Sequence, residues 1–140
     1  MKVYSGSEIR NIALVGHNDT GKTTLVSQLL FNTGATTRLG RIEDGTTTTD
    51  FDQDEIERKH SISAAVAYAE WNNHKINLLD TPGFGIFLME SKAAMRVADA
   101  AAIVVSGVTG VEVTTEKVWK FADEFELPAQ RCYIYLIDIR

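Results

Sequence analysis

The segment from Gly16 to Thr23 constrains this chain more than any other, because its residues, GHNDTGKT, match the pattern G-x-x-x-x-G-K-[S/T]. The short apolar run NIALV at residues 11–15 precedes it, and a pattern with leucine and valine on one helical face follows it. Glycines let such a loop curl so that several backbone N–H groups point inward, where they and the helix N-terminus hold a phosphate. A strand, a loop and a helix in this order therefore predict a phosphate-binding loop rather than an incidental glycine-rich turn.

Two side chains of this loop have specific expected roles. Lys22 should place its ammonium group on the β- and γ-phosphate oxygens, and the Thr23 hydroxyl should ligate Mg²⁺. The expected nucleotide contacts comprise the whole loop: His17, Asn18, Asp19, Thr20, Gly21, Lys22, Thr23 and Thr24.

A second motif, Asp80-Thr-Pro-Gly83, follows the apolar run INLL at residues 76–79. An acid at the carboxyl end of a buried strand beside the phosphate loop is suited to hold Mg²⁺. The backbone N–H of Gly83 can approach a γ-phosphate and sense it. Alone, these four residues would be an ordinary strand-end turn, but their position fifty-odd residues after the phosphate loop favours the functional interpretation.

Alternating strands and helices predict an α/β fold with helices on both faces of a mostly parallel sheet. Residues 66–71 and 75–79 flank Asn72-Asn73 and predict an antiparallel hairpin. The polar stretch 35–60 predicts a mobile binding loop with a short helix at 52–58. The remaining expected elements are strands at 11–15, 101–105 and 133–137 and helices from 21 to 34, 87–98 and 112–125.

The composition narrows the class of protein. The chain has 140 residues, which we expect to form one domain, and a formal net charge of −5, so no general attraction to nucleic acid is expected. Its single cysteine, Cys132, excludes an internal disulfide. No apolar run approaches the ~20 residues that span a bilayer, and no secretory leader is evident. We therefore expect a cytoplasmic domain without a membrane partner.

With both motifs in place, the chain resembles the N-terminal GTP-binding domain of a translational GTPase, most closely elongation factor G and its bacterial paralogues. The segments that carry the resemblance are residues 9–17 (IRNIALVGH), 17–24, 34–52, 98–101 (ADAA), 110–113 (GVEV) and 115–120 (TEKVWK). The resemblance implies a P-loop NTPase fold over residues 1–140, GTP or GDP as the bound nucleotide, and Mg²⁺ as cofactor. It also implies hydrolysis of GTP coupled to translocation on the ribosome, which the family engages through later domains.

Two further residues receive roles by position in this resemblance. Ser61, in the segment Arg58-Lys-His-Ser-Ile62, stands where the family has a threonine that ligates Mg²⁺ when the γ-phosphate is present. The other interpretation is a loop serine that faces solvent. Asp19 matches a loop acid linked in the family to a monovalent cation, and its alternative is a hydrogen bond to its own turn.

The chain departs from the family pattern in three places. Phe84 replaces the histidine that helps to place the attacking water, which puts fast hydrolysis in question. The guanine-reading N-K-x-D is reduced to Tyr135-Leu-Ile-Asp138, so that Asp138 alone could accept hydrogen bonds from the base. Because the sequence stops at Arg140, the resemblance implies a partial domain that lacks its C-terminal strand and helices.

Three functions therefore remain in view. The favoured one is a GTP- and Mg²⁺-binding domain of elongation factor G type, with Lys22 and Gly83 acting on the γ-phosphate and Thr23, Ser61 and Asp80 at the metal. A P-loop kinase or ATPase would bind adenine and an acceptor instead. A non-catalytic nucleotide-binding remnant or regulatory module would retain the nucleotide without turnover.

Overall fold

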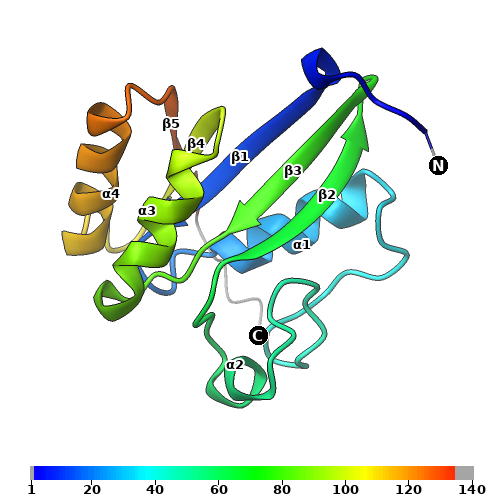
Figure 1. Cartoon of the computed structure of the whole chain (residues 1–140). Coiled ribbons are helices and arrows are strands. Elements are labelled where there is room, and N and C mark those ends of the chain that lie inside the picture. The colour runs from blue at the N-terminus through cyan, green and yellow to red at the C-terminus, as the bar shows by residue number, and fades with distance from the viewer. Residues whose placement is uncertain (1, 135–140) are drawn as a thin grey trace.

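The computed structural model describes residues 2–134 (Figure 1). Its strands are β1 (Ile9–Gly16), β2 (Ala65–Trp71), β3 (His74–Asp80), β4 (Ala100–Ser106) and β5 (Ala129–Ile134). Its α-helices are α1 (Lys22–Asn32), α2 (Gln53–Arg58), α3 (Leu88–Arg96) and α4 (Val113–Glu124). The short 3₁₀ helices η1 (Gly6–Glu8) and η2 (Gly85–Phe87) precede β1 and α3, respectively. None of the helices described is long and apolar enough to cross a membrane.

The strands form one sheet in the order β2-β3-β1-β4-β5. The neighbours β3, β1, β4 and β5 run parallel, and β2 pairs antiparallel with β3. Because β1 lies beside β3, with Leu14 opposite Asp80, the two strands end at the same edge of the sheet. The phosphate loop after β1 and the Asp80 turn after β3 are therefore neighbours.

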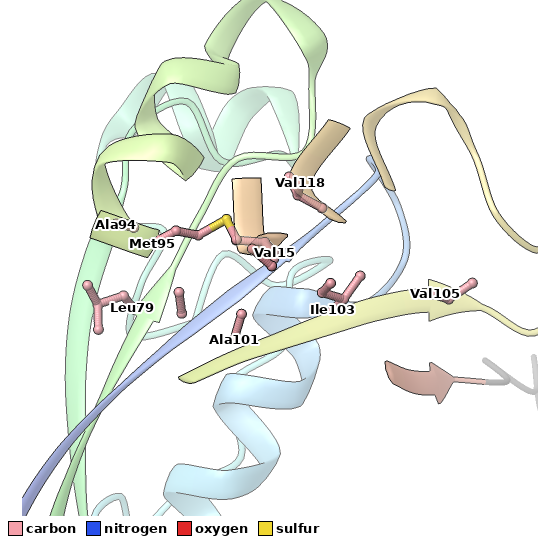
Figure 2. Close-up of a cluster of buried hydrophobic side chains, with 10 residues drawn as sticks. Val15, Leu79, Ala94, Met95, Ala101, Ile103, Val105 and Val118 are labelled. Atoms are coloured by element: carbon pink, nitrogen blue, oxygen red, sulfur yellow. The ribbon is translucent and has the colours of Figure 1, made fainter. Parts of the chain in front are cut away.

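Helices cover both faces of the sheet, as the sequence predicts: α1 lies on one face, and α3 and α4 lie on the other (Figure 1). The alternation along β1 explains this arrangement, because Leu14 packs with α1 while Ala13 and Val15 face the α3–α4 side. The core under α1 consists of Leu14, Val26, Leu30, Ala67, Ala69 and Leu78. The opposite core includes Val15, Met95, Ile103, Val105 and Val118 (Figure 2).

Met95 gives a direct test of this second core. Its side chain reaches toward Val15 (Figure 2) and is 1% exposed, whereas Met89 on the same helix is 69% exposed. We expect Met95→Ala to lower the free energy of unfolding by about 2–5 kcal/mol, because it leaves a cavity, and Met89→Ala to change it by less than about 0.5 kcal/mol. Urea unfolding of both variants checks this, and equal effects would contradict the packing described.

Most predicted elements are confirmed, but the predicted start of the last strand was wrong. The hairpin turns at Asn72 and Asn73 with φ of 47° and 63°, the left-handed values that a type I′ turn requires. The last strand begins at Ala129, four residues before the predicted start, because Ala129 pairs with Ala101 directly after Pro128. Gln130 and Arg131 are polar, so the start of this strand does not show the run of apolar residues by which strands were predicted.

Candidate functional site

The phosphate loop joins the end of β1 to the start of α1. Gly16 closes the strand with φ of 148°, a conformation that other residues rarely adopt. A Cβ added to Gly16 would also collide with the carbonyl oxygen of Val104 in β4. The first helical residue is Lys22, preceded by Gly21 at φ of 90°. The two motif glycines are thus required by the close approach to β4 and by the turn into the helix.

Lys22 is folded back over this loop. Its Nζ donates to the carbonyl oxygen of His17 at 2.7 Å, and the side chain is buried. Burial lowers the pKa of Lys22 to about 8, and the nearby carboxylates of Asp80, Asp19 and Asp50 act in the opposite direction. A phosphate group would restore the anionic partner that this desolvated ammonium group lacks.

The Asp80–Gly83 turn lies directly against the phosphate loop. A Cβ added to Gly83 would lie 2.6 Å from the backbone N of Asn18, from the carbonyl oxygen of His17 and from Nζ of Lys22. Only a residue without a side chain allows this approach. The structure therefore brings Gly83 and Lys22 to the same point, as the sequence predicts for two groups that would share one phosphate.

Hydroxyl and carboxylate groups form a chain of hydrogen bonds beside Lys22. Ser61 Oγ donates to Asp50 Oδ1 at 2.6 Å and lies 3.2 Å from Thr23 Oγ1, close enough for a hydrogen bond between the two hydroxyls. Thr49 Oγ1 donates to Asp80 Oδ2 at 2.6 Å. The three predicted metal-binding residues, Thr23, Ser61 and Asp80, are thus gathered in one region, from segments far apart in the sequence.

Asp50 and Thr49 are site residues that sequence reasoning missed. Both lie in the polar stretch before α2, and both are buried, at 4% and 3% exposure. Asp50 accepts two hydrogen bonds, one from Ser61 and one from Thr47 Oγ1, which lies 3.4 Å from Asp50 Oδ2. The available signal was an acid directly after the run Thr46–Thr49, but nothing in the pattern shows that this run folds back onto β3.

The composition of this cluster fits Mg²⁺. Mg²⁺ prefers oxygen ligands and usually keeps several waters, so that few protein groups are needed. Asp80 Oδ1 is buried and has no hydrogen-bond partner within residues 2–134, which leaves one carboxylate oxygen free for the metal or its water. Burial raises the pKa of Asp80 to about 6 and also raises that of Asp50. A nearby cation would remove the cost of both buried charges.

This pKa shift predicts how stability depends on pH without nucleotide or Mg²⁺. The carboxyl group of Asp80 is protonated in both the folded and the unfolded chain below its usual pKa of 3.8. Between that pH and about 6 the folded chain holds the proton more tightly, so stability falls as pH rises through this window. We expect Asp80→Asn to remove this loss and to be more stable than the wild type above pH 6. Thermal unfolding from pH 4 to 8 measures it, and parallel curves would contradict it.

A cavity of about 40 Å³ lies where these segments meet. It is lined by several of the predicted nucleotide- and metal-binding residues, namely Asn18, Asp19, Gly21, Lys22, Thr23, Ser61 and Gly83. Asp50 and His60 line it as well. The phosphate loop, the segment after α2 and the turn after β3 therefore line one cavity, which is open to solvent on one side.

Other predicted contacts lie elsewhere or serve the loop itself. His17 Nε2 is 3.3 Å from Glu112 Oε2, before α4. Thr20 Oγ1 donates to the carbonyl oxygen of His17 at 3.0 Å, and Thr24 is exposed. The Asp19 carboxylate accepts a hydrogen bond from the neighbouring Asn18 Nδ2 at 2.7 Å, and Asp19 also lines the cavity.

The base-reading prediction cannot be placed on this site, since Asp138 lies outside the described residues. The same is true of the last three positions of the expected strand at 133–137. The described part of the chain therefore contains the residues predicted to contact the phosphates and the metal, without the one predicted to contact the base.

Comparisons with known proteins identify the family to which this site belongs. Residues 7–137 match the family described as the elongation factor Tu GTP binding domain. The chain is 44% identical over 119 residues to the mitochondrial ribosome-releasing factor 2 of Scheffersomyces stipitis, covering 85% of this chain and 14% of that protein. It is 40% identical over 128 residues to elongation factor G of Granulibacter bethesdensis, covering 91% of this chain and 18% of the relative.

A solved structure gives the same result for the fold. A crystal structure of a protein from Thermus thermophilus superimposes with a TM-score of 0.87 at 43% identity, over 91% of this chain and 19% of that one. The chain thus spans less than a fifth of the length of these relatives. From the matched residues, the fold and the phosphate loop beside Asp80, we conclude that this chain belongs to the GTP-binding domain family of elongation factor Tu and is a GTP-binding domain of a translational GTPase similar to elongation factor G.

Proposed function

We propose that this chain binds GTP and GDP together with Mg²⁺ and couples GTP binding and hydrolysis to ribosomal translocation, as the GTP-binding domain of a larger translation factor. The observation that carries the proposal is the meeting of Lys22, Thr23, Ser61 and Gly83 around one cavity. Lys22 and the Gly83 N–H would hold the γ-phosphate, since both lie at the same point of the loop. Mg²⁺, when bound, would neutralise charge on the phosphates.

Two segments, residues 58–62 and the turn at residues 80–83, would report the state of the nucleotide. Thr23 and Ser61 would ligate the metal through their hydroxyls. Asp80, which accepts a hydrogen bond from Thr49, would bind the metal or one of its waters. Because Ser61 lies outside the rigid sheet, in the segment after α2, loss of the γ-phosphate would release it. Loss of the contact at Gly83 would release the turn before α3 in the same way.

The ribosome is the partner that the relatives' names suggest, through domains beyond this segment. Relatives named elongation factor G and ribosome-releasing factor 2 match the chain at 40–45% identity. The single cysteine, Cys132, is a free thiol, which suits the reducing cytoplasm that we propose as the site of action. Guanine recognition through Asp138 is part of the same proposal and rests on the family resemblance.

A second candidate function is nucleotide binding without turnover. Phe84 favours it, because a phenyl ring cannot hydrogen-bond a water from the position that follows Gly83. In this case the chain would act as a regulatory module that binds the nucleotide and does not hydrolyse it.

A chimeric factor would test the proposed function. Residues 9–134 would replace the aligned segment of elongation factor G from Granulibacter bethesdensis, with a Lys22→Ala version as the matched control. We expect the chimera to bind ribosomes with a non-hydrolysable GTP analogue, and the control to lose this dependence. Turnover of GTP on ribosomes would exclude the second candidate. Ribosome binding that ignores the nucleotide in both chimeras would contradict the proposal.

A further inference from the structure

His60 and Phe84 face one another at the edge of the nucleotide cavity. Their ring centroids are 4.7 Å apart with an interplanar angle of 61°, an edge-to-face contact. His60 lines the cavity together with Lys22, Ser61 and Gly83. An imidazole thus approaches the phosphate region from the segment after α2, directly opposite the turn where this chain has a phenyl ring.

The orientation of the His60 ring is fixed by a backbone contact. Its Nδ1 lies 2.8 Å from the carbonyl oxygen of Arg58, and because a carbonyl can only accept, Nδ1 carries the hydrogen. In the neutral ring Nε2 is then the acceptor, and no group within residues 2–134 donates to it. The tight turn at Lys59, with φ of 59°, and the bond from His60 N to the Glu55 carbonyl oxygen at 3.2 Å hold the backbone in place.

We propose that His60 is the catalytic hydrogen-bond acceptor for the water that attacks the γ-phosphate. The inference rests on the proposed function, since it requires GTP in this cavity. In this chain His60, and not residue 84, would supply the imidazole, and Phe84 packs edge-to-face against it. Without nucleotide, the cavity that His60 lines has a volume of about 40 Å³ and is also lined by Lys22 and Gly83.

The step is a hydrolysis that balances without another reactant. The water oxygen forms a bond to the γ-phosphorus while the bond from that phosphorus to the bridging oxygen breaks. The electron pair of the broken bond stays on GDP, and the water protons end on inorganic phosphate and solvent. Nε2 of His60 accepts one hydrogen bond from the water and so orients a lone pair of the water oxygen toward the phosphorus.

Single-turnover hydrolysis of radiolabelled GTP by the 140-residue chain tests this role, with the affinity for a fluorescent GDP analogue measured on each preparation. We expect His60→Phe to slow hydrolysis by about 10²-fold or more and to change GDP affinity by less than about threefold. His74→Phe is the matched control, because His74 Nδ1 makes the same bond to a carbonyl oxygen, that of Asn72 at 2.9 Å, but lies in the hairpin turn. This control should hydrolyse GTP at the wild-type rate.

Two more variants keep the test decisive. The exchanged pair His60→Phe with Phe84→His should recover hydrolysis to within about tenfold of the wild type, since the contact of the rings persists. His60→Gln retains an acceptor oxygen, so it should hydrolyse GTP faster than His60→Phe does. If His60→Phe no longer binds GDP, the comparison of His60→Gln with the wild type decides the role of His60. If the wild-type chain binds GDP but hydrolyses GTP no faster than these variants, the role of His60 is wrong and the proposed nucleotide binding still stands. Wild-type chain that binds no GDP would overturn the proposed function and this inference together.

Discussion

Replacing Lys22 with alanine is expected to abolish tight nucleotide retention while leaving the fold intact. The ammonium group is buried over the phosphate loop and bonds only to the His17 carbonyl oxygen within the described chain. Each charge-assisted hydrogen bond contributes about 1.5–3 kcal/mol, so the loss of one alone corresponds to roughly 10- to 150-fold weaker binding. Removal of a desolvated charge also relieves a cost in the free chain, so the variant should unfold no earlier than the wild type without nucleotide.

Affinity for a fluorescent GDP analogue and thermal unfolding without nucleotide measure the two parts of this expectation. Lys92→Ala is the matched control, because Lys92 pairs with Glu124 at 3.0 Å between α3 and α4, away from the cavity. It should bind GDP as the wild type does. If Lys22→Ala also kept the wild-type affinity, the assignment of the phosphate loop would be wrong.

Gly83→Ala is expected to weaken binding of GTP analogues selectively. A Cβ at this position would lie 2.6 Å from three atoms of the phosphate loop, so either the turn or the loop must move. Overpacking of this kind costs about 1–3 kcal/mol, which corresponds to roughly 5- to 150-fold in affinity if the γ-phosphate contact is what gives way. GDP, which lacks that phosphate, should lose less.

The neighbouring glycine gives a close control for this substitution. A Cβ added to Gly85 has no heavy atom within 4 Å, so Gly85→Ala should alter either affinity by less than about twofold. The measured quantity is the ratio of the dissociation constants for a non-hydrolysable GTP analogue and for GDP. An equal ratio in both alanine variants would mean that Gly83 does not approach the γ-phosphate.

The central part of the fold could be predicted because its signals are local. The apolar run before Gly16 and the helical pattern after Gly21 specify a strand and a helix, and the motif between them specifies the loop. Asn72-Asn73 predicts the hairpin because asparagine tolerates the left-handed conformation that the turn requires. Two neighbouring parallel strands then bring Asp80 and the phosphate loop to the same edge of the sheet.

The remaining features depend on contacts between distant residues. Thr49 forms a hydrogen bond with Asp80, 31 positions away in the sequence, and Ser61 forms one with Thr23, 38 positions away. Thr49 and Ser61 lie in or next to a polar stretch whose residues show neither helical nor strand periodicity. The sequence identified Ser61 only by resemblance and missed Asp50 altogether. The contact of His60 with Phe84 joins two aromatic rings 24 positions apart, and only the folded chain places them together.

Equilibrium binding of fluorescent GDP and ADP analogues to the purified chain, in Mg²⁺ and in EDTA, shows whether the cavity holds a guanine nucleotide together with its metal. We expect micromolar or tighter binding of the guanine analogue in Mg²⁺, weaker binding in EDTA, and weaker binding of the adenine analogue in both buffers. A folded chain that binds neither analogue, or that binds both equally with and without Mg²⁺, would contradict the claim that this cavity holds a guanine nucleotide with its metal.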